Sequence, residues 1–116
     1  MARKKKLERD FQPKVMEEIK QRLPGALVTK FEGEQGWPDL LILYENKWAM
    51  LECKKEENAI HQPNQDYYVE MLNNMSFSRF VYPENKEEVL DELEQALQTR
   101  GTARTTRRKQ TKLGDG

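Results

Sequence analysis

The segment that decides the fold is residues 36–54, Gly-Trp-Pro-Asp-Leu-Leu-Ile-Leu-Tyr-Glu-Asn-Lys-Trp-Ala-Met-Leu-Glu-Cys-Lys. Two short runs of apolar and aromatic residues, 40–44 and 47–51, flank Glu45-Asn46, a pair typical of a tight turn. The segment therefore predicts a β-hairpin. A two-residue turn places Tyr44 opposite Lys47 and fixes the pairing of all residues further from the turn.

This pairing places Asp39 directly opposite Glu52. Two carboxylates there would lie about 5 Å apart, and facing like charges destabilise a sheet unless a cation lies between them. Lys54 follows Glu52 by two residues, so the alternation of a strand puts both side chains on one face. Two acids and one amine on one face predict a divalent-metal site with an adjacent cation, which suits attack on a phosphodiester.

Length and composition limit the class of protein. A chain of 116 residues forms one domain with a modest core. No apolar run approaches the ~18 residues of a membrane span, and no apolar segment follows the basic N-terminus, so neither a membrane segment nor a secretory signal is expected. The single cysteine excludes an internal disulfide framework and suits a reducing cytoplasm.

The net charge of zero hides a strong asymmetry. Residues 1–9 and 99–116 are strongly basic, whereas residues 10–98 carry 18 of the 20 acidic side chains. Basic blocks of this kind are often interaction tails that bind phosphates, although they can also serve only to keep a protein in solution. The candidate nucleic-acid-binding side chains of the two ends are Arg3, Lys4, Lys5, Lys6, Arg104, Arg107, Arg108 and Lys109.

Periodicity places helices around the hairpin. An apolar repeat of Phe11, Val15, Ile19 and Leu23 predicts a helix over residues 7–22, and Pro13 is expected in its first turn, with the helix beginning near Asp10. A second helix is expected from residue 63 to about residue 74, with an apolar stripe, and a third over residues 84–98. The predicted stripe of the second helix is Tyr68, Met71, Leu72 and Met75; that of the third is Val89, Leu90, Leu93 and Leu97.

Further strands are expected at residues 26–32 and 78–82, and composition predicts disorder after residue 99. The predicted order is α-β-β-β-α-β-α. A strand that returns to a sheet after a helix usually joins it parallel.

The residues Gly36-x-Pro38-Asp39, Glu52-x-Lys54 and Gln65, with Tyr68 one helical turn later, resemble the core of the PD-(D/E)xK nuclease superfamily. The chain is most similar to small, stand-alone phage and bacterial members of its VRR-type (virus-type replication-repair) nuclease branch. The resemblance implies an α/β, restriction-endonuclease-like core with a mixed sheet flanked by helices. The resemblance spans about residues 8–98, the expected nuclease domain, and leaves outside it a basic arm over residues 1–7 and a basic tail over residues 99–116.

The resemblance also assigns roles. It implies that Asp39 and Glu52 bind Mg²⁺ or Mn²⁺ with the backbone carbonyl of Cys53. Lys54 would position the attacking water or stabilise developing charge, and Gln65 would orient water or phosphate. Tyr68 would contact the nucleic-acid backbone.

Members of the superfamily take one more acid from the first helix. Here Glu8, which lies on the inward side if the helix starts early, is preferred over Glu18, close to the same stripe. Glu17 is rotated away from that stripe.

The implied function is a metal-dependent DNA endonuclease, acting on branched or Holliday-junction-like DNA as a homodimer in a bacterial or phage-infected cytoplasm. The alternatives are a nucleic-acid-binding module with a degenerate site and a regulatory protein that reuses the fold. Several residues also have purely structural interpretations: salt bridges for Asp39 and Glu52, a helix start for Gln65, packing for Tyr68 and Trp37, and a loop position for His61. The Cys53 thiol is expected in the core.

Overall fold

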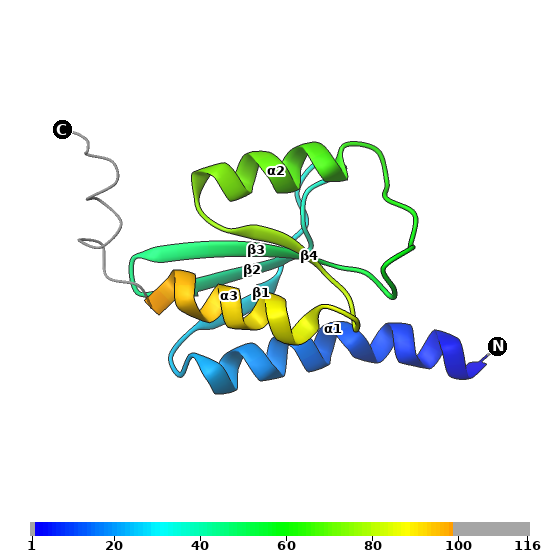
Figure 1. Ribbon diagram of the computed structural model, residues 1–116, viewed down its shortest axis with the longest axis horizontal. Helices are drawn as coiled ribbons and strands as arrows, with labels where there is room; N and C mark the ends of the chain where they lie inside the picture. Colours follow the sequence, from blue (N-terminus) through cyan, green and yellow to red (C-terminus); the bar gives the residue numbers. More distant parts are fainter. Residues whose placement is uncertain (1, 99–116) are drawn as a thin grey trace.

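A computed structural model describes residues 2–98, with side chains from residue 10 onward. Four strands form one mixed sheet in the order β1-β2-β3-β4. Figure 1 shows α1 and α3 on one face of this sheet and α2 on the other. The predicted α/β class and the order α-β-β-β-α-β-α are confirmed.

The hairpin is the centre of the sheet. Strands β2 (Leu40–Tyr44) and β3 (Lys47–Cys53) pair antiparallel, and Tyr44 faces Lys47 as predicted. Glu45 in the turn has φ of 57°, in the left-handed region that short hairpin turns require. The register therefore puts Leu40 and Ile42 of β2 in the core.

The outer strands join this hairpin in opposite senses. Strand β1 (Leu27–Lys30) pairs antiparallel with β2 and is shorter than expected. Strand β4 (Ser78–Val81) pairs parallel with β3, as expected for a strand that returns after a helix.

The first helix differs from the prediction. Helix α1 (Ala2–Arg22) does not begin near Asp10; it continues through Pro13. An interior proline costs about 3 kcal/mol, because a backbone hydrogen bond is lost and the ring crowds the preceding turn. Burial of the stripe of four apolar side chains contributes about 1.5–3 kcal/mol each, enough to hold one continuous helix against the sheet.

The stripe of the second helix was only partly predicted. Helix α2 (Gln65–Met75) begins two residues later than expected, after Asn64 with φ of 72°. Its buried residues are Gln65, Val69 and Leu72, whereas Met75 is 65% exposed. The true stripe follows the i, i+4, i+7 spacing from Gln65, a polar residue that an apolar search passes over.

Helix α3 (Lys86–Gln98) completes the layer with α1 and buries its four predicted apolar side chains. The described helices include none that is both long and apolar enough to cross a membrane. The tail predicted to be disordered, 99–116, lies outside the described residues.

Candidate active site

Asp39 lies immediately before β2, where three elements converge. Its backbone carbonyl accepts a hydrogen bond from the N–H of Phe31 at 2.9 Å, which continues the β1–β2 pairing. Its carboxylate Oδ1 accepts from the backbone N–H of Cys53 at 3.2 Å, and Oδ2 accepts from Nε2 of Gln12 at 3.0 Å. The carboxylate is thereby held between β3 and α1.

Glu52 lies near the end of β3 and is only 7% exposed. Its Oε2 accepts a hydrogen bond from Nε2 of Gln65 at 2.9 Å and lies 3.9 Å from Nζ of Lys54. Both contacts come from one side of the sheet, so the predicted alternation of Glu52 and Lys54 agrees with the structure.

The two carboxylates are electrostatically strained. Burial, and then the neighbouring charge of Asp39, raises the pKa of Glu52 to about 7. Burial also raises the pKa of Asp39, although the hydrogen bonds from Cys53 and Gln12 oppose the shift. Desolvation and proximity both penalise the doubly ionised pair, and Lys54 compensates only in part.

Gln65 links the cation to the acid. Its side-chain oxygen accepts from Nζ of Lys54 at 2.7 Å and from the backbone N–H of Gln62 at 2.7 Å, while its amide nitrogen donates to Glu52. Lys54 also donates to the carbonyl of Ile60 at 3.1 Å. Gln65 is therefore a buried bridge rather than only a helix-start residue.

An open cleft of about 1000 Å³ reaches Asp39 and Lys54 from the side of α1. It runs between Phe11, Gln12 and Pro13 of α1 and the loop after β3. Lys30, Lys54 and Lys55 line it together with Asp39. A polyanion entering this cleft would meet three amines beside the carboxylate of Asp39.

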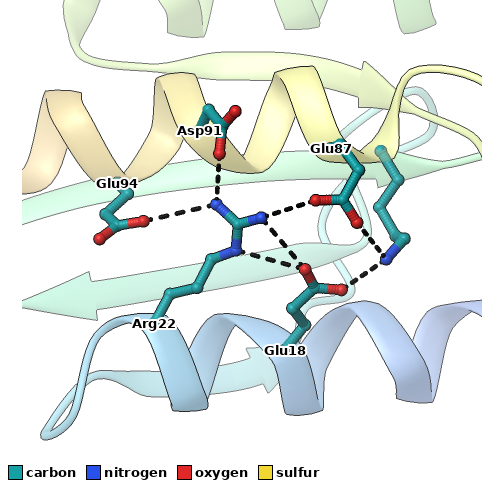
Figure 2. A network of polar contacts seen from close by, with 6 residues as sticks. Glu18, Arg22, Glu87, Asp91 and Glu94 are labelled. Atoms are coloured by element: carbon teal, nitrogen blue, oxygen red, sulfur yellow. Dashed lines mark hydrogen bonds and ion pairs between the residues drawn. The ribbon is translucent and has the colours of Figure 1, made fainter.

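Helix α1 supplies Gln12 to the site. Because the sequence search considered only acids on this helix, it missed Gln12. Glu17 is exposed, as expected. Glu18 is held elsewhere: Figure 2 shows it with Arg22, facing α3, and it also pairs with Lys86. The side chain of Glu8 lies outside the described ones, one helical turn before Gln12 in the sequence.

The donor set fits a hard divalent cation. Asp39 and Glu52 offer carboxylate oxygens whose mutual repulsion a cation would relieve. Among the side chains of residues 10–98, no three of the types His, Cys, Asp and Glu gather into a metal-binding group. Two carboxylates suit Mg²⁺ in particular, since this ion is usually bound through one or two carboxylates and keeps several waters.

The remaining candidates take ordinary or peripheral places. Burial raises the pKa of the Cys53 thiol, which packs against the core, so the thiol is expected to be unreactive. His61 lies on a loop, where its Nδ1 is 2.7 Å from Asp66 and its ring stacks on Phe80. Tyr68 contacts the ring of Trp37. The candidate side chains Arg3, Lys4, Lys5, Lys6, Arg104, Arg107, Arg108 and Lys109 lie outside the described side chains.

Comparison with solved structures supports the resemblance. The chain is similar to a structure described as a VRR_NUC domain, with 27% identity and a TM-score of 0.51 over 68% of this chain and 92% of that one. No protein-family model matches the sequence, and no curated protein matches it. The chain has the restriction-endonuclease-like fold of a VRR-NUC-type nuclease domain, and the resemblance inferred from its sequence is confirmed.

Proposed function

We propose that this chain is a metal-dependent DNA endonuclease that hydrolyses phosphodiester bonds. The observation that carries the proposal is the constellation of Asp39, Glu52 and Lys54, in which two partly buried acids with raised pKa values adjoin one amine. A folded protein tolerates such repulsion mainly where function uses it, so clustered raised pKa values point to a site. The VRR-NUC-type fold supports nuclease chemistry there.

In this proposal Asp39 and Glu52 hold Mg²⁺ or Mn²⁺, with the Cys53 carbonyl as a further ligand. The N–H of Cys53 points to Asp39, and the N–H and C=O of one residue in an extended strand point to the same edge. When bound, the ion would lower the pKa of a coordinated water and neutralise charge on the scissile phosphate.

Lys54 acts on the charge that develops during the reaction. Its ammonium is held by two neutral oxygens, from Gln65 and Ile60, and is 3.9 Å from the Glu52 carboxylate. Among the described residues its one ion pair is the long contact with Glu52, so the ammonium can also donate to a phosphate oxygen or orient the attacking water. Gln65 fixes Lys54 and Glu52 relative to one another, which limits the reorganisation needed on binding.

Two further parts of the proposal rest on residues at the ends of the chain. Glu8 is the preferred first-helix acid, because Gln12 reaches Asp39 and residues four apart share a helix face. The basic side chains of residues 3–6 and 104–109 supply non-specific phosphate affinity. A homodimer would present two sites to branched DNA, as the family resemblance implies.

The decisive experiment incubates the purified chain with supercoiled plasmid, single strands and a four-way junction, in Mg²⁺, Mn²⁺ or chelator. Metal-dependent cleavage by the wild type and its loss in Asp39→Asn would support the proposal. The matched control is Glu17→Gln, which changes an exposed acid of α1 and should cleave normally. Tight binding without cleavage in any metal would instead favour the binding module with a degenerate site.

A further inference from the structure

A continuous row of aromatic rings lies beside the acidic pair. Ring centroids are 5.7 Å apart for Phe31 and Trp37, 5.1 Å for Trp37 and Tyr68, and 5.1 Å for Tyr68 and Tyr67. We name these four side chains the aromatic ledge. The first two come from the loop before β2, and the last two come from the first turn of α2.

The ledge adjoins the catalytic residues of the proposed function through the backbone. Phe31 donates its N–H to the carbonyl of Asp39, and Trp37 precedes Asp39 by two residues. Tyr68 follows Gln65 by one helical turn. The cleft described above, on the side of α1, is lined by Asp39 and three amines, whereas none of the four rings lines it.

Two glycines let the loop that carries Phe31 and Trp37 pack closely. A Cβ on Gly33 would lie 2.7 Å from the ring of Phe31 and 3.0 Å from that of Trp37. Gly36 has φ of 99°, and a Cβ there would lie 2.7 Å from Asn64, at the start of α2. Only glycine lets the loop press against both the rings and the helix. The loop is thus closely packed against two of the rings and the start of α2.

Packing does not account for the outermost ring. Phe31, Trp37 and Tyr68 are partly buried, but Tyr67 is 61% exposed and meets Tyr68 edge-on. An exposed tyrosine at the end of an ordered row offers a flat face to a second flat molecule.

The charges around the ledge favour a base over a phosphate. Exposed carboxylates flank its members in the sequence and would repel a polyanionic backbone, whereas they impose no such penalty on the face of a neutral base. These carboxylates belong to Glu32, Glu34, Asp66 and Glu70.

We propose that the aromatic ledge stacks an unpaired base of the substrate next to the scissile phosphate, with Tyr67 as the contacting ring. Bases inside a duplex are covered on both faces by their neighbours, so the ledge selects nucleic acid with a single-stranded segment beside the cleavage point. The inference rests on the proposed nuclease function and identifies the part of the substrate that this site recognises.

The test is a binding assay in chelator, so that it needs no cleavage. A single-stranded oligonucleotide with a fluorescent base analogue is titrated with wild type, Tyr67→Ala and Tyr67→Phe. The matched control is Met75→Ala, since Met75 is similarly exposed at the opposite end of α2. Tyr67→Ala should bind roughly 5- to 100-fold more weakly, the effect of losing one stacked base, whereas Tyr67→Phe and Met75→Ala should match the wild type. Affinity for a relaxed circular duplex should be the same for all four.

Other results would overturn the proposal. Unchanged binding by Tyr67→Ala, or equal losses in Tyr67→Ala and Met75→Ala, would mean that no base stacks on Tyr67. A blunt duplex that competes as well as the single strand would assign the ledge to a terminal base pair instead. If Tyr67→Ala binds and cleaves like the wild type, the ledge proposal is refuted and the nuclease proposal stands. If the wild type does not cleave but Tyr67→Ala shows the predicted loss of binding, the nuclease proposal is refuted and the ledge proposal stands.

Discussion

Two charged clusters involve helix α1, and they are built in opposite ways. Around Arg22, one guanidinium bonds four carboxylates of α1 and α3: Glu18 at 3.2 Å, Glu87 at 2.9 Å, Asp91 at 2.7 Å and Glu94 at 3.4 Å (Figure 2). Around Asp39 and Glu52, two carboxylates share one amine, 3.9 Å from Glu52.

The pKa shifts of the two clusters differ accordingly. Hydrogen bonds from Lys86 and Arg22 lower the pKa of Glu18, so that cluster favours its ionised state. Burial raises the pKa of Asp39, and burial together with the charge of Asp39 raises the pKa of Glu52, so the second cluster opposes its own ionised state. One arrangement joins two helices, while the other keeps unbalanced negative charge available for a ligand.

The largest expected effect separates activity from stability at the acidic pair. Asp39→Ala and Lys54→Ala should each reduce plasmid cleavage by about 100-fold or more, because each removes a group that acts on the reacting phosphate. Thermal melting should show that both variants are folded. In Asp39→Ala, loss of the carboxylate also removes its repulsion of Glu52. Full activity in either purified variant would refute the catalytic assignment.

The next effect is a pH dependence of stability in metal-free protein. Glu52 has a pKa of about 7 in the fold against an ordinary 4.5, so between these values the folded chain retains a proton that the unfolded chain has lost. Stability from this group is therefore lost as pH rises through that range, with a total of about 3 kcal/mol.

Urea denaturation of wild type and Glu52→Gln at pH 5 and pH 8 isolates this contribution. The loss of stability that Glu52 causes as pH rises should be absent from Glu52→Gln. At pH 8 this variant should be more stable than the wild type. Identical pH profiles for the two proteins would show that Glu52 titrates normally.

A smaller effect concerns the basic tail. Removal of residues 99–116 should weaken DNA binding roughly 10-fold at low salt and flatten its salt dependence, because each lost phosphate contact lowers the logarithmic slope by about 0.9. Cleavage at saturating protein should persist. Complete loss of function on truncation would favour a nucleic-acid-binding module in which the basic ends alone bind the nucleic acid.

The smallest effect is expected at the balanced cluster. Arg22→Ala should cost about 1 kcal/mol of unfolding free energy, since two of its four partners, Glu87 and Asp91, are exposed and such ion pairs contribute little. Denaturation at low and high salt would measure it, with Arg22→Lys as the conservative control. Cleavage should remain at the wild-type level, and a large loss of activity would show that the two clusters are coupled.

Strong local signals explain what the sequence could predict. Turn chemistry at Glu45-Asn46 and period-two alternation were enough to give the register of the hairpin, in which Leu40 faces Leu51. Continued by one pair, this register would set Asp39 opposite Glu52. Gln65 was found through the family resemblance. The structure places it as a buried bridge between Lys54 and Glu52, and its role towards water or phosphate stays a prediction.

The errors arise where tertiary contacts outweigh local preference. Pro13 suggested a helix start, but burial of the apolar stripe holds the helix through it. Gln12 has no acidic or apolar signature, so only the packing of α1 against the sheet brings its amide to Asp39. The stripe of α2 was misplaced because one of its buried members, Gln65, is polar and is compensated by hydrogen bonds that no periodicity reveals.

The central claim is that Asp39 and Glu52 hold one cation between them beside Lys54. A crystal of the protein soaked in Mn²⁺ tests it most directly, through the anomalous difference density of the ion. We expect a peak within coordinating distance of both carboxylates in the wild type and its absence in Asp39→Asn. Carboxylates that point to opposite sides of the sheet, or manganese bound elsewhere and not between them, would contradict the account.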